Sequence, residues 1–174
     1  QETAGPPTLG KGSHYFLVRP IFLFSGSPTL NFLLEEKKMK QSTYHFKLLR
    51  VNLTDGTMTE EKIDEGEAKK YIGGRGLATK WLYDDGIQHV DPLSEENKLV
   101  FITGPLTGSN SPTAGRYMVV TKAPLNGLIG SANSGGVWGA RLKYAGWDAI
   151  IVEGKSEKPV YLYIEDDKYE LRDA

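Results

Sequence analysis

From residue 45 onward, hydrophobic residues occur in short runs that are separated by turn-forming residues. Residues 45–53 and 58–63 have the composition of two strands, and Asp55-Gly56 between them predicts a hairpin turn. Five more runs are typical of strands: residues 98–103, 117–122, 149–152, 160–164 and 169–172. The hydrophobic pattern therefore predicts about seven strands.

Three segments between these strands predict short helices. The first begins at Asp64 and ends at Gly73-Gly74, because glycines permit the left-handed backbone angles that terminate a helix. The second covers residues 77–83, and the third covers residues 137–145, with Gly146 at its end. Hairpin-length turns join most of the elements. Their order predicts an α+β, sheet-dominated domain rather than a series of βαβ units.

The first 40 residues differ from the rest, so we expect an N-terminal extension over residues 1–40 and one folded domain over residues 41–174. The extension holds an apolar stretch, residues 15–34, which Arg19 and Pro20 interrupt. This interruption leaves far fewer than the ~20 continuous apolar residues of a membrane-spanning helix and is unlike the core of a signal peptide. A weakly ordered extension and an arm that docks a partner are both open interpretations.

Composition narrows the functional classes. The chain has 174 residues, which is the size of one domain, and 21 basic against 22 acidic side chains. It has no Cys, so it forms no disulfide, no thiolate zinc site and no cysteine-held iron–sulfur cluster of its own. The balanced charge argues against a nucleic-acid partner but leaves room for a small anion site.

Glycine clusters mark where chemistry is expected. Residues 130–136 (GSANSGG) precede the helix predicted from Val137, and a helix start offers free backbone N–H groups to an anion. Either Asn133 or Ser134 is expected to cap this helix, which leaves the other to contact a ligand. The alternative is a simple cap in a tight turn. Gly135 and Gly136 would let the ligand approach the backbone.

Two arginines accompany the glycines. Arg116 stands at the head of a predicted strand after residues 111–115, and its planar guanidinium suits a phosphate or a polar heterocycle. Arg75 lies in Gly73-Gly74-Arg75-Gly76, where it serves either the end of the preceding helix or a ligand. For Arg116, an ordinary surface position is the alternative.

Other catalytic patterns are missing from the sequence. His14, His45 and His89 are isolated, and the chain contains neither a His-x-x-x-His spacing nor a Gly-x-Ser-x-Gly turn. The acidic residues occur mainly in predicted turns, which is typical of a solvated surface. We therefore predict no catalytic side chain, and a domain that holds a ligand for chemistry supplied elsewhere.

An ordered series of motifs resembles a known family. The motifs are residues 73–77 (GGRGL), 91–99 (DPLSEENKL), 104–108 (GPLTG), 112–117 (PTAGRY), 132–136 (ANSGG) and 145–154 (AGWDAIIVEG). In this order they resemble the N-terminal domain of the tungsten-containing aldehyde:ferredoxin oxidoreductases, over about residues 50–174. The resemblance implies a domain with two β-sheets on which the cofactor rests.

The resemblance also implies a cofactor and residues that bind it. In the family, dithiolene sulfurs of two pterins (molybdopterin) hold tungsten, and magnesium joins the two cofactor phosphates. Arg116 is similar to the family arginine between pterin and iron–sulfur cluster, and Asn133 and Gly135 are similar to the pterin-binding pair. The main-chain carbonyl of Asn133 is the implied magnesium contact. From the glycine clusters and the second arginine, Ser134, Gly136 and Arg75 are further predicted cofactor-binding residues.

The remaining implications concern the whole enzyme. The resemblance implies a cytoplasmic, often archaeal oxidoreductase that oxidises an aldehyde to a carboxylic acid, passes electrons to ferredoxin and in some members forms a homodimer. Because this chain has no Cys, the iron–sulfur cluster would be held outside it, by the remaining domains, and the chain alone would be inactive. A stand-alone or remnant ligand-binding module without catalytic activity is the alternative. The identity of the aldehyde, and tungsten against molybdenum, stay open.

Overall fold

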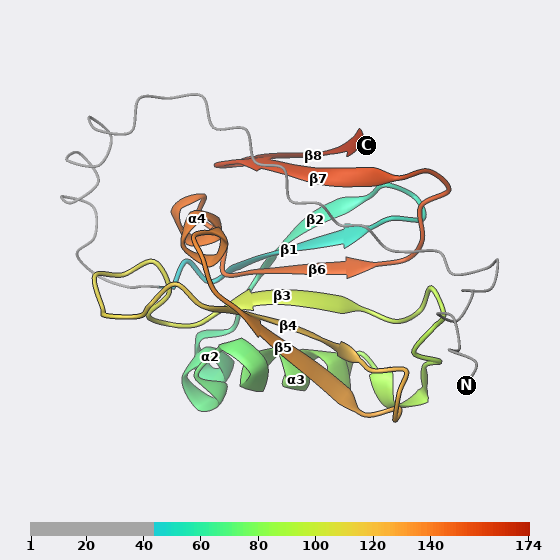
Figure 1. The fold of residues 1–174 in the computed structure, drawn as a ribbon, viewed down its shortest axis with the longest axis horizontal. Helices are drawn as coiled ribbons and strands as arrows, with labels where there is room; N and C mark the ends of the chain where they lie inside the picture. The colour runs from blue at the N-terminus through green and yellow to red at the C-terminus, as the bar shows by residue number, and fades with distance from the viewer. Residues whose placement is uncertain (1–43) are drawn as a thin grey trace, which may run out of the picture.

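The computed structural model describes residues 44–174, so the extension predicted over residues 1–40 lies outside the described residues. One mixed sheet and one antiparallel sheet form the frame of the fold (Figure 1). The large sheet has the order β2-β1-β6-β3-β4-β5, and β7 and β8 form a second, two-stranded sheet. The strands are β1 (Lys47–Asn52), β2 (Met58–Lys62), β3 (Leu99–Thr103), β4 (Tyr117–Lys122), β5 (Ile129–Ser134), β6 (Ala149–Glu153), β7 (Val160–Glu165) and β8 (Lys168–Asp173).

Helices cover parts of both faces of the large sheet. They are α2 (Glu65–Tyr71), α3 (Gly74–Asp84) and α4 (Trp138–Tyr144), with a 3₁₀ turn, η1 (Ile87–His89). Asp64 caps α2, since its Oδ1 accepts a hydrogen bond from the Glu67 N–H at 2.8 Å. None of the helices within residues 44–174 has the length and apolar character needed to cross a bilayer.

Neighbouring strands pair antiparallel, with one exception. β1 and β6 are parallel, with Leu49 opposite Ile150, and β6 also pairs antiparallel with β3. A parallel pair needs a long connection, and here the whole segment from β2 to α4 lies between the two strands in sequence. β1 and β6 are both interior strands of the sheet, and each places buried side chains on both of its faces.

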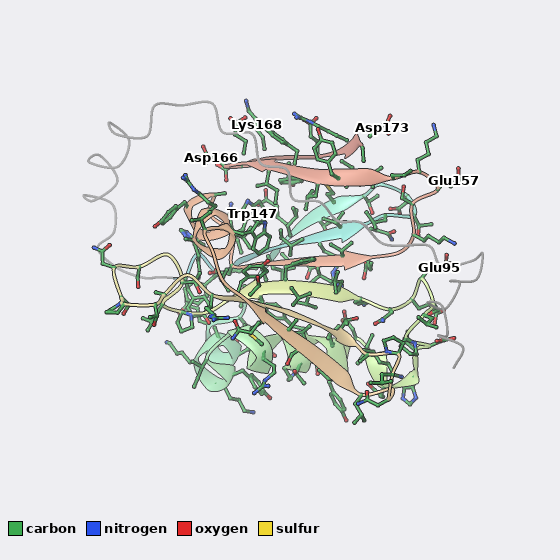
Figure 2. The ribbon with its side chains drawn as sticks, viewed as in Figure 1. Glu95, Trp147, Glu157, Asp166, Lys168 and Asp173 are labelled. Carbon is green, nitrogen blue, oxygen red and sulfur yellow. The ribbon has the colours of Figure 1, made fainter. Side chains whose placement is uncertain are left out.

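The alternation of strand side chains divides the core into two layers. Leu48, Val100 and Ile151 face α3, which contributes the buried Leu77 and Leu82. The opposite layer is formed by buried residues in or next to β1, α4, β6 and β7, and its members are Leu49, Val51, Leu53, Leu142, Trp147, Ile150, Val152 and Ile164. Figure 2 shows Trp147 between the large sheet and the β7–β8 hairpin, where its indole N–H donates to the Asp166 carbonyl at 3.1 Å.

The predicted α+β fold with two sheets is confirmed, but the prediction missed one strand. Residues 129–134 form β5, whereas the sequence predicted no strand here and showed residues 130–136 as a glycine cluster ahead of a helix. This segment (IGSANS) has little strand propensity of its own. Its pairing with β4, from Lys122 opposite Ile129 to Tyr117 opposite Ser134, makes it a strand.

Two local predictions are wrong for the same reason, namely that elements begin elsewhere. Asn133 and Ser134 lie in β5 and cap no helix, because the N-cap of α4 is Val137, without a side-chain cap bond. Helix α3 begins at Gly74 rather than residue 77. Arg75 therefore lies in the first turn of α3 and does not serve the C-terminal end of α2.

Candidate cofactor-binding site

The glycine clusters meet at one end of the large sheet. Thr103, the last residue of β3, is opposite Tyr117, the first residue of β4, and Tyr117 is opposite Ser134, the last residue of β5. The loop of residues 104–116 and the segment that leads into α4 therefore leave the sheet together, at the left of Figure 1. We call residues 73–76, 104–117 and 133–139 the glycine-rich end.

These segments are in close contact, two of them backbone to backbone. A Cβ atom added to Gly115 would lie 3.0 Å from the carbonyl oxygen of Gly136, and one added to Gly139 would lie 3.2 Å from that of Gly115. A Cβ atom added to Gly73, which precedes α3, would lie 3.5 Å from Cδ of Pro105. The three predicted clusters, distant in sequence, are thus neighbours in space.

Arg116 and Asn133 are joined directly. Nη1 of Arg116 donates a hydrogen bond to Oδ1 of Asn133 at 3.3 Å, and both side chains are exposed. Asn133 is opposite Met118, so its side chain lies on the α3 face of the sheet, and Arg75 lies in the first turn of that helix. A guanidinium has five N–H donors and this bond uses one, so Arg116 retains donors for a ligand.

Ser134 points the other way. Successive strand residues face opposite sides of a sheet, so the side chains of Asn133 and Ser134 are on different faces. Ser134 is opposite Tyr117, whose ring packs against that of Trp138 in α4 with centroids 4.3 Å apart. The structure therefore brings together Arg116, Asn133 and the start of α3, while Ser134 and Gly136 lie toward α4.

The main-chain groups of Asn133 face the open edge of β5. At the turn of the β4–β5 hairpin, the Ala123 N–H donates to the Leu128 carbonyl at 2.8 Å. Ala123 and Leu128 are therefore a hydrogen-bonded pair, from which the other pairs of the hairpin can be counted. Hydrogen-bonded and non-hydrogen-bonded pairs alternate along an antiparallel ladder, and the Met118–Asn133 pair is five steps further on. It is therefore a non-hydrogen-bonded pair, and the carbonyl of Asn133 points away from β4, toward the side where the described residues supply no further strand.

The charge around this end suits an anion. Residues 97–147 contain no Asp or Glu, although the whole chain has 22 of them, and the glycine-rich end itself includes Arg75 and Arg116. The Arg116 side chain is exposed. Among residues 44–174, no three His, Cys, Asp or Glu side chains are grouped as a metal site. Backbone N–H groups, arginines and a free carbonyl fit a phosphate-bearing cofactor whose metal is held by its own sulfur atoms.

The sequence prediction missed a buried ion pair behind the site. Lys143 is 3% exposed and Asp148 is 1% exposed, and their side chains form a salt bridge. Oδ2 of Asp148 also accepts a hydrogen bond from the His45 N–H at 2.9 Å. Asp148 lies within the motif of residues 145–154, but only the structure identifies Lys143, five residues earlier, as its partner.

Tyr44 connects this pair to the start of α3. The ammonium of Lys143 lies 4.5 Å from the centroid of the Tyr44 ring, and the Tyr44 hydroxyl donates to the Ile72 carbonyl at 2.5 Å. Burial, and then the charge of Asp148, raise the pKa of Tyr44 to about 12, whereas burial lowers the pKa of Lys143. Tyr44 thus keeps its proton at neutral pH and holds the turn that precedes Arg75.

A solved structure places this fold among oxidoreductase domains. The structure described as “Active site complex BamBC of Benzoyl Coenzyme A reductase in complex with 1,5 Dienoyl-CoA” matches with a TM-score of 0.74 and 39% sequence identity, over 76% of this chain and 20% of that one. The fold is thus that of an α+β domain within a much larger reductase.

Sequence relatives then identify the family. The family described as “Aldehyde ferredoxin oxidoreductase, N-terminal domain” matches residues 48–174, and the chain belongs to it. The tungsten-containing aldehyde ferredoxin oxidoreductase of Pyrococcus abyssi is 60% identical over 75% of this chain and 22% of that protein. The aliphatic sulfonate oxidoreductase, WOR-like subunit, of Pyrococcus furiosus is 44% identical over 75% of this chain and 21% of that protein. The chain thus spans about a fifth of the length of these relatives.

Proposed function

We propose that the glycine-rich end binds the phosphate and pterin portions of a tungsten cofactor in an aldehyde:ferredoxin oxidoreductase. The observation that carries the proposal is the pairing of exposed Arg116 with Asn133 at a sheet end where glycine backbones meet and carboxylates are absent from residues 97–147. Family membership and the tungsten-containing relatives support the same assignment.

Each residue has a separate role in this proposal. Arg116 donates hydrogen bonds to the cofactor, and Asn133 orients its guanidinium. The outward-facing carbonyl of Asn133 is the proposed magnesium ligand. Backbone N–H groups of Gly135 and Gly136 and the hydroxyl of Ser134 bind from the α4 side, and Arg75 adds a second positive charge.

The names of the relatives support a cofactor role rather than a substrate role. Proteins that share this domain are named for aldehyde, aliphatic sulfonate and benzoyl coenzyme A chemistry. A domain common to such different substrates is expected to hold what the enzymes share. When bound, the tungsten cofactor supplies the two-electron chemistry that converts an aldehyde to a carboxylic acid.

The rest of the enzyme completes this proposal. The iron–sulfur cluster is held by cysteines outside this chain, because the chain has none. Ferredoxin accepts the electrons, and the enzyme acts in the cytoplasm. A homodimer is the assembly to test by light scattering of the complete protein.

Elemental mass spectrometry on the protein from its own organism, with whatever is bound to it, tests the function. Tungsten together with iron is expected, whereas molybdenum in place of tungsten would change the metal but retain the site. Metal-free protein would contradict the proposal and favour a ligand-binding module without catalysis.

Arg116→Ala in the complete enzyme tests the site itself. We expect tungsten content and turnover to fall about tenfold or more, since charged hydrogen bonds to the cofactor are lost. The melting temperature should change little, because the side chain is exposed. Full activity with a lower melting temperature would contradict the assigned role.

A further inference from the structure

The loop between β3 and β4 determines where Arg116 lies. Residues 104–116 contain no helix or strand, so hydrogen bonds outside regular structure must fix its course. One of these, from the Gly108 N–H to the Ala114 carbonyl at 3.0 Å, closes the loop on itself. It does not attach the loop to the sheet.

The hydroxyl of Thr107 makes that attachment. Thr107 is 6% exposed, and its Oγ1 donates a hydrogen bond to the main-chain carbonyl of Arg116 at 2.9 Å. The same oxygen accepts a hydrogen bond from the Gly104 N–H at 3.0 Å. One buried hydroxyl thus connects the residue after β3 to the residue before β4.

The methyl group of Thr107 fixes the side chain from the other direction. A Cβ atom added to Gly139 of α4 would lie 3.2 Å from Cγ2 of Thr107, so this methyl group packs against the helix. A β-branched side chain has few rotamers, and contacts on both branches select one of them. The hydroxyl is therefore directed at Arg116 by the position of α4.

We propose that Thr107 is a positioning residue for Arg116, which it holds at the place where the guanidinium bonds Asn133 and meets the cofactor. This inference rests on the proposed function of Arg116. Two variants separate the contributions of Thr107: Thr107→Val retains the shape and the methyl group, and Thr107→Ser retains the hydroxyl. Thr121→Val is the matched control, because Thr121 also donates a hydroxyl hydrogen bond, to Oδ1 of Asn97 at 3.2 Å, toward the opposite end of β4.

Amide hydrogen exchange in the 174-residue chain tests the attachment without any cofactor. The Gly104 N–H is a direct reporter, since its acceptor is the Thr107 hydroxyl. We expect Thr107→Val to speed its exchange about tenfold, and Thr107→Ser and Thr121→Val to leave it near the wild-type rate. Unchanged exchange in Thr107→Val would overturn the positioning role.

Tungsten content of the complete enzyme, measured per mole of purified protein, tests the consequence. We expect a several-fold loss in Thr107→Val and recovery in Thr107→Ser, with Thr121→Val equal to wild type. Faster exchange at Gly104 with full tungsten content in Thr107→Val would overturn the inference while leaving the proposed function intact. Full tungsten content in Arg116→Ala would instead overturn the proposed function, so the two failures are distinguishable.

Discussion

At the scale of single residues, the turn that precedes Arg75 depends on a close contact with Tyr44. Gly73 has φ of 111°, a conformation that side chains with a Cβ atom rarely adopt. A Cβ atom at this position would overlap the Tyr44 hydroxyl oxygen. That hydroxyl is already held by the Ile72 carbonyl, so it has little freedom to move away.

We predict that Gly73→Ala lowers the free energy of unfolding by about 2–4 kcal/mol, through both backbone strain and overlap. Gly86→Ala is the control, because Gly86 has φ of 76° but no atom within 4 Å of the added Cβ. It should cost only the backbone strain, about 1–2 kcal/mol. Urea denaturation of both variants measures the difference, and equal losses would show that the Tyr44 contact is unimportant.

At the scale of elements, one charged cluster joins the end of α3 to three strands. Asp85 follows α3, and its Oδ2 is 2.6 Å from Nζ of Lys98, ahead of β3, and 3.2 Å from Nη1 of Arg50 in β1. Arg50 also contacts Glu153 in β6 at 3.2 Å. Partial burial makes these contacts more effective than salt bridges at a fully exposed surface.

The pH dependence of this cluster follows from Asp85. Burial acts to raise the pKa of Asp85, but hydrogen bonds and charges from Lys98 and Arg50 outweigh it and hold the pKa below its ordinary value of 3.8. A carboxylate with a depressed folded-state pKa stabilises the fold above the unfolded-state pKa, and this contribution is lost as the pH falls through the folded-state pKa.

We therefore predict that Asp85→Asn destabilises the chain by about 1 kcal/mol at pH 7. The difference from wild type should shrink below about pH 4, where the wild-type carboxylate takes up its proton. Chemical denaturation from pH 7 to the acid range measures this trend. Asp84→Asn is the control, since Asp84 pairs on the surface with Lys80 of the same helix. If the stability difference between Asp85→Asn and wild type did not change with pH, the argument would be refuted.

At the scale of the whole molecule, the Lys143–Asp148 pair holds separate layers together. Lys143 belongs to α4, Asp148 precedes β6, and the Asp148 carboxylate accepts N–H groups from the segment that enters β1. Tyr44 extends the connection to the turn between α2 and α3, on the opposite face of the sheet. The pair thus fixes the arrangement from which the glycine-rich end is built.

We predict that Asp148→Asn lowers the free energy of unfolding by about 3–5 kcal/mol, because it leaves the Lys143 ammonium buried without its counter-charge. The double variant Lys143→Met with Asp148→Leu removes both charges and should recover part of this loss. Thermal unfolding of the three proteins measures the effect. If Asp148→Asn were as stable as wild type, the Lys143–Asp148 pair would be unimportant for the fold.

The amino-acid sequence by itself determined the α+β class, the positions of seven strands and three helices, and the membership of the family. These features follow from local patterns: alternation within 10 or fewer residues, glycines at turns, and short motifs in a fixed order. The same patterns also selected Arg116, Asn133 and Arg75 for attention, and their roles as cofactor ligands stay predictions.

Only the tertiary structure decided which contacts the candidate site residues make. Residues 129–134 are a strand because β4 supplies hydrogen-bond partners that no local propensity reveals. The contact of Arg116 with Asn133, the opposite directions of Asn133 and Ser134, and the attachment by Thr107 depend on strand register and on where α4 returns to the sheet. Such contacts join residues that are distant along the chain, and the free energy that selects them comes from packing the whole domain.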